Sequence, residues 1–246
     1  MTTGNDKKIE TIDLKRWEEA QEGELDGHIH SYDSTVFPGD DPSRQGDPWG
    51  PQDEIDHYKE KSYPRYFDLM EIDTDLNGKH IVEIGCALVS GLEQCSNGKK
   101  TVIEPLIKRT DNIHVRNTIS RMEECDISIL AEPAEHDTIP ECDEVWIFNL
   151  LQHVISPEKI LTDAMSRSKV IRFFEPLEQQ TNIEHPHTLT KKFFDSVLYE
   201  ECDEEKSWAK LWLESDVTSQ DGFHQWSPCY YGVWHRKEET TEKESN

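Results

Sequence analysis

The chain has 246 residues, of which 34% are hydrophobic and 31% charged, and its formal net charge is −25 at pH 7. This length suits one α/β domain with additions, or two small domains. The charge argues against nucleic acid as a partner, because an acidic surface repels phosphate backbones and the densest basic stretches are pairs such as Lys99-Lys100. No run approaches the roughly 20 apolar residues that span a bilayer, so we expect no membrane association.

The cysteine pattern and the first residues indicate a cytoplasmic protein. The six cysteines include no CxxC pair and show no zinc-like spacing. The N-terminal stretch MTTGNDKKIE lacks the hydrophobic core of a secretory signal. We therefore expect reduced cysteines and no disulfide bonds.

Composition divides the chain into three predicted parts. Residues 1–58 are rich in Gly, Pro, Asp and Glu and contain one helical pattern, from Ile12 to about Glu22. Residues 59–236 have the apolar content of a folded domain, and residues 237–246 read as a solvated acidic tail.

The polar N-terminal part carries aromatic side chains that gain little from exposure to water. Trp17 lies in the helical pattern, and Trp49 lies in a stretch that Pro and Gly keep irregular. We predict that residues 24–53 form a lid whose aromatic side chains cover the mouth of a pocket.

A histidine motif in the same part suggests a metal site, which we consider a minor alternative. Asp26-Gly27-His28-Ile29-His30 resembles the HxH strand of amidohydrolases. That chemistry needs an apolar strand before the motif and a barrel of about 250 residues, whereas EEAQEGEL precedes it here. A surface site made of His28, His30 and Asp33 is a second minor alternative, and we expect no metal.

Between the two ends, apolar strands alternate with helical patterns. The predicted strands are 81–84, 101–103, 127–130, 144–149, 169–174, 208–214 and 229–235; the predicted helices are 54–70, 91–96, 157–166 and 188–201, and 108–126 is an irregular connection. This alternation predicts an α/β fold with a mostly parallel sheet. The last two strands have no helix between them and should form an antiparallel edge.

Residues 80–107 have the layout of a nucleotide-binding βαβ unit. The strand Ile81–Ile84 leads to Gly85, where the backbone can turn sharply and let a ligand approach. A helix start follows, and the next strand ends in Glu104, which can accept both hydroxyls of a ribose. An ordinary tight turn without a ligand is the alternative interpretation.

Five motifs in order resemble one family, the class I S-adenosylmethionine-dependent methyltransferases. EIGCALVSGL resembles the family's E-I-G-C-G-P-V-x-G-L turn, and TVIEPLI is similar to its second strand. The stretch from ILAEPAEH to LLQHVISPEKIL resembles the third strand, the adenine loop and the fourth strand, and HPHTLTKKFFDSV and YYGVWHRK resemble later elements. The resemblance runs from about Trp17 to Arg236.

The resemblance implies a doubly wound, Rossmann-like, mostly parallel seven-stranded sheet with an antiparallel C-terminal edge, and S-adenosyl-L-methionine as the cofactor. Glu83 would steady the first turn and reach the methionine amino group, and Glu132 or Glu135 would accept the adenine amino group. The implied cofactor-binding residues are Glu83, Gly85, Cys86, Ala87, Gly91, Glu104, Pro105, Glu132, Glu135 and Asn149.

Three histidines are the candidate bases. His153 follows the fourth strand near the expected methyl group, and His185 and His187 flank a proline after the fifth strand. An imidazole can take a proton from an acceptor hydroxyl near neutral pH, but packing or capping roles are equally compatible with the sequence.

The departures from the family pattern bear on the acceptor and on activity. Asn149 is followed by Leu-Leu-Gln and not by Pro-Pro-aromatic, which argues against methylation of exocyclic base nitrogens. We expect transfer to an oxygen of a small molecule or sugar, with nitrogen as the second choice. Ala87 and Leu88 replace Gly and Pro of the turn, so a catalytically weak or inactive methyltransferase-like binding module is the alternative function.

Overall fold

The structure, a computed structural model, describes residues 9, 11–30, 55–182, 185–199, 202–213 and 228–238, and only the backbone of residues 26–30. Most of the predicted lid, including Trp49, lies outside these ranges, as do the side chains of the HxH motif, Asp33 and the tail from residue 239 onward.

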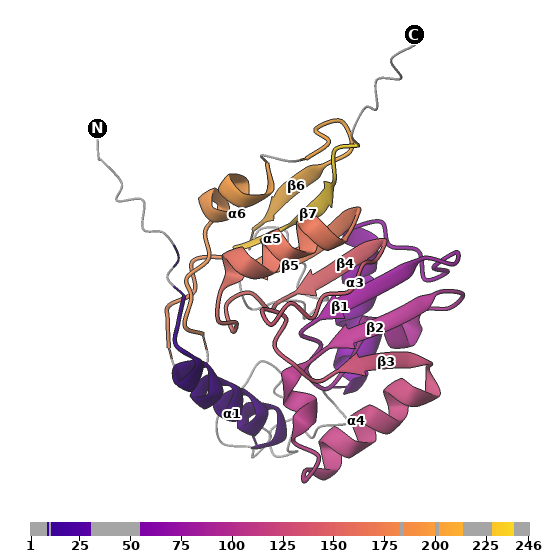
Figure 1. The fold of residues 1–246 in the computed structure, drawn as a ribbon, viewed down its shortest axis with the longest axis vertical. Coiled ribbons are helices and arrows are strands. Elements are labelled where there is room, and N and C mark those ends of the chain that lie inside the picture. Colours follow the sequence, from indigo (N-terminus) through magenta and orange to yellow (C-terminus); the bar gives the residue numbers. More distant parts are fainter. Residues whose placement is uncertain are drawn as a thin grey trace, which may run out of the picture.

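A seven-stranded sheet forms the centre of the fold (Figure 1). Its strands are β1 (His80–Ile84), β2 (Lys99–Ile103), β3 (Ile127–Leu130), β4 (Glu144–Phe148), β5 (Val170–Pro176), β6 (Trp208–Trp212) and β7 (Cys229–His235). Their order is β3-β2-β1-β4-β5-β7-β6, and the first five are parallel. β7 runs antiparallel to both β5 and β6, which confirms the predicted antiparallel edge.

Helices cover both faces of this sheet. α3 (Tyr63–Leu69) and α4 (Ile113–Glu124) lie on one face, and α5 (Pro157–Arg167) and α6 (Lys191–Leu198) on the other. α1 (Leu14–His30) lies across the ends of the strands (Figure 1). A π-helical turn at Tyr58–Ser62 and 3-10 turns at Gly91–Gln94 and Pro105–Lys108 complete the helical elements of the described residues. Because side chains alternate along a strand, β4 sends Trp146 and Phe148 toward α3, and Val145 and Ile147 toward α5 and α6.

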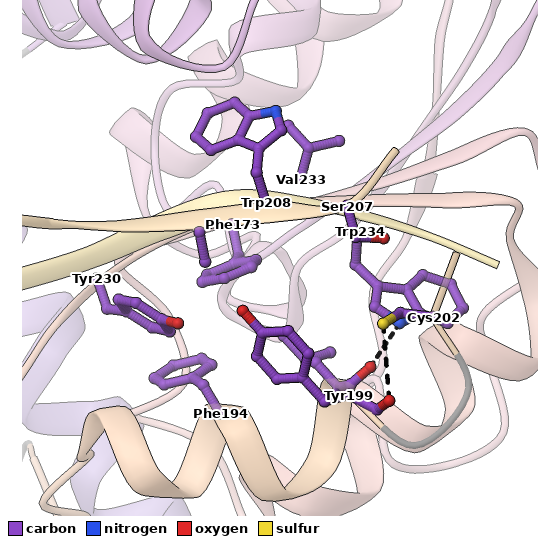
Figure 2. A pocket seen from close by; sticks show the side chains of 11 residues that line it. Phe173, Phe194, Tyr199, Cys202, Ser207, Trp208, Tyr230, Val233 and Trp234 are labelled. Atoms are coloured by element: carbon purple, nitrogen blue, oxygen red, sulfur yellow. Dashed lines mark hydrogen bonds between the residues drawn. The ribbon is translucent and has the colours of Figure 1, made fainter. Parts of the chain in front are cut away.

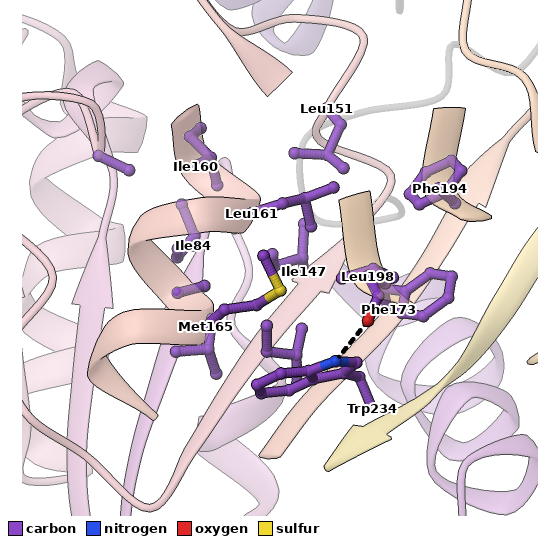
Figure 3. Packing of buried hydrophobic residues seen from close by; sticks show 14 of the residues in the cluster. Ile84, Ile147, Leu151, Ile160, Leu161, Met165, Phe173, Phe194, Leu198 and Trp234 are labelled. Atoms are coloured by element: carbon purple, nitrogen blue, oxygen red, sulfur yellow. Dashed lines mark hydrogen bonds between the residues drawn. The ribbon is translucent and has the colours of Figure 1, made fainter. Parts of the chain in front are cut away.

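The face under α5 and α6 is packed by aliphatic and aromatic side chains (Figure 3). Leu161 and Met165 of α5 and Leu198 of α6 are buried against Ile147. The indole N–H of Trp234 donates a hydrogen bond of 2.7 Å to the carbonyl of Leu198, which fixes the end of α6 on β7. This packing makes the sheet a rigid support for the loops at its edges.

Three predicted elements of the sheet domain differ from the structure. Residues 108–126, predicted as irregular, contain helix α4, which Asn112 begins by accepting a hydrogen bond of 2.7 Å from the His114 N–H. The predicted helix 91–96 is a single 3-10 turn, because its capping box is followed at once by an extended residue, Cys95. The predicted helix 188–201 begins only at Lys191, after the Thr190 cap.

The N-terminal helix is longer than predicted and extends from Leu14 to His30 rather than from Ile12 to about Glu22. Among the described residues, no helix is both long enough and apolar enough to cross a membrane. All six cysteines are free, and four of them are buried.

Candidate functional site

The candidate site lies at the edge of the sheet that is formed by the carboxyl ends of the parallel strands. This edge faces α1 and is distinct from the antiparallel edge (Figure 1). Gly85 follows β1, Glu104 follows β2 and Asn149 follows β4. Backbone hydrogen bonds hold these positions to the neighbouring strands: Gly85 N–H donates to the Ile103 carbonyl (2.9 Å), and Asn149 N–H donates to the Phe174 carbonyl (2.7 Å). The edge therefore gathers the predicted positions, as doubly wound sheets do.

Glu104 connects the first turn to the end of β2. Its side chain is buried, and its carboxylate accepts hydrogen bonds from the Ala87 N–H (2.7 Å) and the Leu106 N–H (2.9 Å). The second bond caps the 3-10 turn that begins at Pro105. Glu104 is thus a structural part of the edge, held between two backbone segments.

Two residues of the first turn have a left-handed backbone, Gly85 with φ 72° and Ala87 with φ 48°. A Cβ at Gly85 would also lie 2.2 Å from Cδ1 of Leu150, so both the backbone and the packing require glycine there. Ala87 adopts the same region without the freedom of glycine, and the turn therefore stores some strain.

Glu83 is the buried acid that supports this turn. It accepts hydrogen bonds from the Tyr63 hydroxyl (2.9 Å), the Ser90 hydroxyl and the Gly91 N–H (3.3 Å). Burial raises the pKa of Glu83, against the opposing effect of these donors. A Cβ at Gly91 would lie 2.7 Å from Cδ1 of Tyr63, so the glycine is explained by this contact.

Glu83 is paired with these donors, and its contact with a methionine amino group stays a prediction. Cys86, between the two left-handed residues, is buried, and burial raises the pKa of its thiol. Its position favours packing over reactivity.

The two glutamates of the predicted adenine loop have different surroundings. Glu132 is half exposed and forms an ion pair of 2.8 Å with Lys108. Glu135 is buried, and its Oε1 accepts hydrogen bonds from the N–H groups of Ile155 (2.7 Å) and Ser156 (3.2 Å). Glu135 therefore fixes the start of α5.

His153 lies in a buried polar cluster after β4. Its Nε2 is 3.4 Å from Nε2 of Gln152, and its Nδ1 is 3.7 Å from a carboxylate oxygen of Glu24 on α1. The ring of His185 meets the His153 ring edge to face, with centroids 4.5 Å apart. Gln152 Nε2 also donates to Oδ1 of Asn149 (3.3 Å), which has a left-handed backbone with φ 54°.

Two polar atoms of this cluster, Oε1 of Gln152 and Nδ1 of His153, are buried and have no hydrogen-bond partner among the described residues. Such atoms are costly to leave unpaired, and they mark a place where a ligand or water completes the bonding.

The other two candidate histidines differ in their ability to act as a base. Nε2 of His187 is 2.7 Å from the Val154 carbonyl, and burial lowers the pKa of this imidazole. His187 therefore fixes the loop. Burial lowers the pKa of His185 to about 4, and nearby His153 contributes a smaller lowering, so His185 is neutral at physiological pH.

Helix α1 covers the two turns of the site. Leu25 is buried with Leu88 of the first turn, Leu106 of the second and Val115 of α4. Trp17 of the same helix is also buried. Helix α1 of the N-terminal part thus lies over the edge of the sheet where the site residues gather.

Sequence reasoning missed three residues of this edge: Glu24, Gln152 and Glu175. Glu175 is fully buried near the end of β5 and accepts hydrogen bonds from the N–H groups of Leu150 (2.9 Å) and Leu151 (3.1 Å). An acid within a buried strand, as in FFEP, was an available signal. Glu24 had none, since the helix carries several similar glutamates.

A small apolar pocket lies elsewhere, between α6 and the antiparallel edge (Figure 2). Its lining includes Phe173, Phe194, Tyr199, Cys202, Tyr230 and Trp234. The surface that this lining exposes to the pocket is almost wholly apolar. Among the described residues, no group of three His, Cys, Asp or Glu side chains is arranged to hold a metal ion.

Comparison with known proteins gives a consistent result at the level of fold. No protein-family model matches the chain, and a search of curated proteins finds no match. Among solved structures, the N-methyltransferase NodS from Bradyrhizobium japonicum WM9, solved with S-adenosyl-L-homocysteine, is 14% identical, with a TM-score of 0.50, over 91% of this chain and all of that one.

Two further structures agree. The pyocyanin biosynthetic protein PhzM is 10% identical, with a TM-score of 0.51, over 90% of this chain and 68% of its own. TehB from Haemophilus influenzae is 10% identical, with a TM-score of 0.51, over 75% of this chain and 67% of its own. With its strand order and antiparallel edge, this chain has the fold of the class I S-adenosylmethionine-dependent methyltransferases.

Proposed function

We propose that this protein is an S-adenosylmethionine-dependent methyltransferase that acts on an oxygen of a small molecule or sugar, with nitrogen as the second choice. One observation carries the proposal: the buried Glu104 carboxylate lies at the end of β2 and binds the backbone of the turn after β1 at Ala87. This places an acid and a tight backbone turn side by side, the combination that a nucleoside cofactor needs.

The residues at this edge fit such a cofactor. A carboxylate has about four lone-pair positions, so the group that fixes the turn can also accept ribose hydroxyls. Oε1 of Gln152, three residues after Asn149, has no hydrogen-bond partner among the described residues and offers a buried acceptor for a bound molecule. Glu132 and Lys108 flank the second turn and would border an adenine ring.

When bound, the cofactor supplies a methyl group that is already activated for transfer. The protein then has to align the acceptor and exclude water. Helix α1 serves the second task, because Leu25 seals the turns after β1 and β2. His153 serves as the base that receives the acceptor's proton, because His187 is held by a backbone carbonyl.

The alternative, a binding module without turnover, is supported by Ala87 and by the contact of Leu150 with Gly85. Incubation of the protein with S-adenosylmethionine and a panel of small hydroxylated compounds, followed by mass spectrometry, separates the two. Release of S-adenosylhomocysteine together with a product heavier by one methylene unit supports the enzyme. Binding without any turnover across sugars, phenols and amines supports the module.

A further inference from the structure

Glu24 lies on the N-terminal helix but faces the histidine that follows β4. Its Oε2 is 3.7 Å from Nδ1 of His153, and Gln21, one turn earlier on α1, donates a hydrogen bond of 3.0 Å to the same oxygen. The Glu24 side chain is 19% exposed and that of His153 is 9% exposed. A charge and an imidazole that meet in so little water interact more strongly than a surface pair.

The hydrogen-bond directions around His153 agree on one tautomer. The Gln152 amide nitrogen can only donate, and it reaches both Oδ1 of Asn149 (3.3 Å) and Nε2 of His153 (3.4 Å). Nε2 is then an acceptor, so the proton sits on Nδ1, which faces the Glu24 carboxylate. If the Gln152 amide were rotated by 180°, its oxygen would face the Asn149 oxygen, and both are acceptors. The Gln152 oxygen would then require the proton on Nε2 of His153, which would leave the Nδ1 lone pair facing the Glu24 carboxylate.

The other groups that face His153 do not disturb this arrangement. Two titratable side chains contact His153, namely Glu24 on α1 and His185 on the segment after β5. His185 is neutral at physiological pH, since burial lowers its pKa to about 4. His187, on the same segment, is bound to the Val154 carbonyl.

We propose that Glu24 is a positioning residue, which holds His153 in the Nδ1–H tautomer and so makes Nε2 the atom that accepts a proton. This rests on the proposed function of His153 as the base. The separation of 3.7 Å is longer than a hydrogen bond, and such contacts commonly tighten when the acceptor binds. With a sulfonium cofactor bound, the acceptor's O–H bond would break and its proton would go to Nε2, in place of the Gln152 N–H. The acceptor oxygen would form the bond to the methyl carbon while the bond from that carbon to sulfur breaks, so that a neutral thioether leaves.

It follows that His153 is held in the Nδ1–H tautomer only when α1 is docked. The helix contacts the edge through Leu25, which packs on Leu88 and Leu106 and is next in sequence to Glu24. The same helix would therefore close the site and orient the base.

The tautomer can be measured without cofactor or acceptor. In ¹⁵N-labelled protein at about pH 8, where an ordinary imidazole is neutral, long-range ¹H–¹⁵N spectra distinguish a protonated Nδ1 from a protonated Nε2. The His153 signals are identified by their loss in His153→Gln. We expect the wild type to show Nδ1–H, and Glu24→Ala to lose that preference. Glu22→Ala, at an exposed position of the same helix, should leave the spectrum unchanged.

Docking of α1 is checked by amide hydrogen exchange of residues 14–25. Glu24→Gln has the size of the native residue and a weaker acceptor oxygen, so it keeps the helix docked and should give an intermediate tautomer ratio. A wild-type spectrum dominated by Nε2–H would contradict the proposal. So would an unchanged ratio in both Glu24 variants.

Turnover gives a second test once an acceptor is known. Loss of a charge-assisted contact should lower kcat about 10- to 100-fold in Glu24→Ala. Affinity for S-adenosylhomocysteine should stay within about twofold, because Glu24 serves the acceptor side. Absence of cofactor binding in the wild type would refute the proposed function, whereas the tautomer spectra test the role of Glu24 on their own.

Discussion

At the scale of single residues, Ala87 carries a measurable cost. Its φ of 48° is a conformation that glycine adopts without strain and that costs other residues about 1–2 kcal/mol. Glycine loses part of this advantage through the greater entropy of its unfolded chain, so Ala87→Gly should raise the free energy of unfolding by about 0.5–1 kcal/mol.

Urea unfolding measures this change. Ala131→Gly is the matched control, because Ala131 is similarly half-buried and does not have a left-handed backbone. Ala131→Gly should therefore lower the free energy of unfolding, by about as much as Ala87→Gly raises it. Destabilisation by Ala87→Gly equal to that by Ala131→Gly would show that the turn is not strained.

Glu175 should make stability depend on pH. Burial raises its pKa from the ordinary 4.5 to about 8, against the effect of the Leu150 and Leu151 N–H donors. Between these two values the folded protein keeps a proton that the unfolded chain has released. The free energy of unfolding therefore falls as pH rises from about 4.5 to about 8, and this contribution levels off above that.

Glu175→Gln removes the titrating group, so the wild-type slope should exceed that of the variant by up to about 1.4 kcal/mol per pH unit. Denaturant unfolding at several pH values between 5 and 9 gives both slopes. Glu178→Gln, at an exposed position, controls for the loss of one negative charge. Parallel slopes in wild type and Glu175→Gln would mean that the carboxyl group is ionised throughout.

Residues that follow buried strands could be found from the sequence, and those on other elements could not. Glu104 and Asn149 were predicted at the edge because the ends of parallel strands gather there. The roles of the histidines depend on contacts with residues distant in sequence, such as the 2.7 Å contact between His187 and Val154. A single sequence does not indicate which backbone carbonyl a side chain will meet.

At the scale of elements, the strands were predicted more accurately than the helices. Strand β4 is fully buried and reads as an apolar run, EVWIF, that fits no other element. Helix α4 was missed because only three of its twelve residues are buried, namely Val115, Thr118 and Met122. With so narrow an apolar stripe, its Asn112 cap was the remaining signal.

Helix α1 buries Trp17, Ala20 and Leu25, and Leu25 is the side chain that packs on the turns of the site. Leu25 is 3% exposed and packs on Leu88, Leu106 and Val115. Truncation of a buried leucine to alanine costs about 2–5 kcal/mol, which is a large part of what can hold a single peripheral helix. Leu25→Ala should therefore lower the hydrogen-exchange protection of residues 14–25 while the sheet keeps its protection.

Leu14→Ala, which changes a side chain that is 48% exposed on the same helix, is the control and should exchange as the wild type does. Protection of α1 that survives Leu25→Ala would place the docking contact elsewhere on the helix.

At the scale of the whole molecule, the candidate site joins segments that are far apart in sequence. Glu24 on α1, Ala87 after β1, Glu104 after β2 and His153 after β4 meet at one edge only in the folded chain. A ligand at this edge therefore stabilises the fold as a whole, by about 2.7 kcal/mol at a hundred times its dissociation constant. The net charge of −25 favours a cofactor with a positive sulfonium over a polyanion.

Titration calorimetry with S-adenosylhomocysteine, comparing wild type with Glu104→Ala, tests the central claim most directly. We expect one site per chain in the wild type. Loss of the charge-assisted hydrogen bonds to the ribose should weaken binding about 10- to 100-fold in the variant. Circular dichroism verifies that the variant is folded, since the Ala87 and Leu106 N–H groups lose their acceptor as well. Absence of binding heat in the wild type at millimolar ligand, or equal affinity in a folded Glu104→Ala variant, would contradict the account.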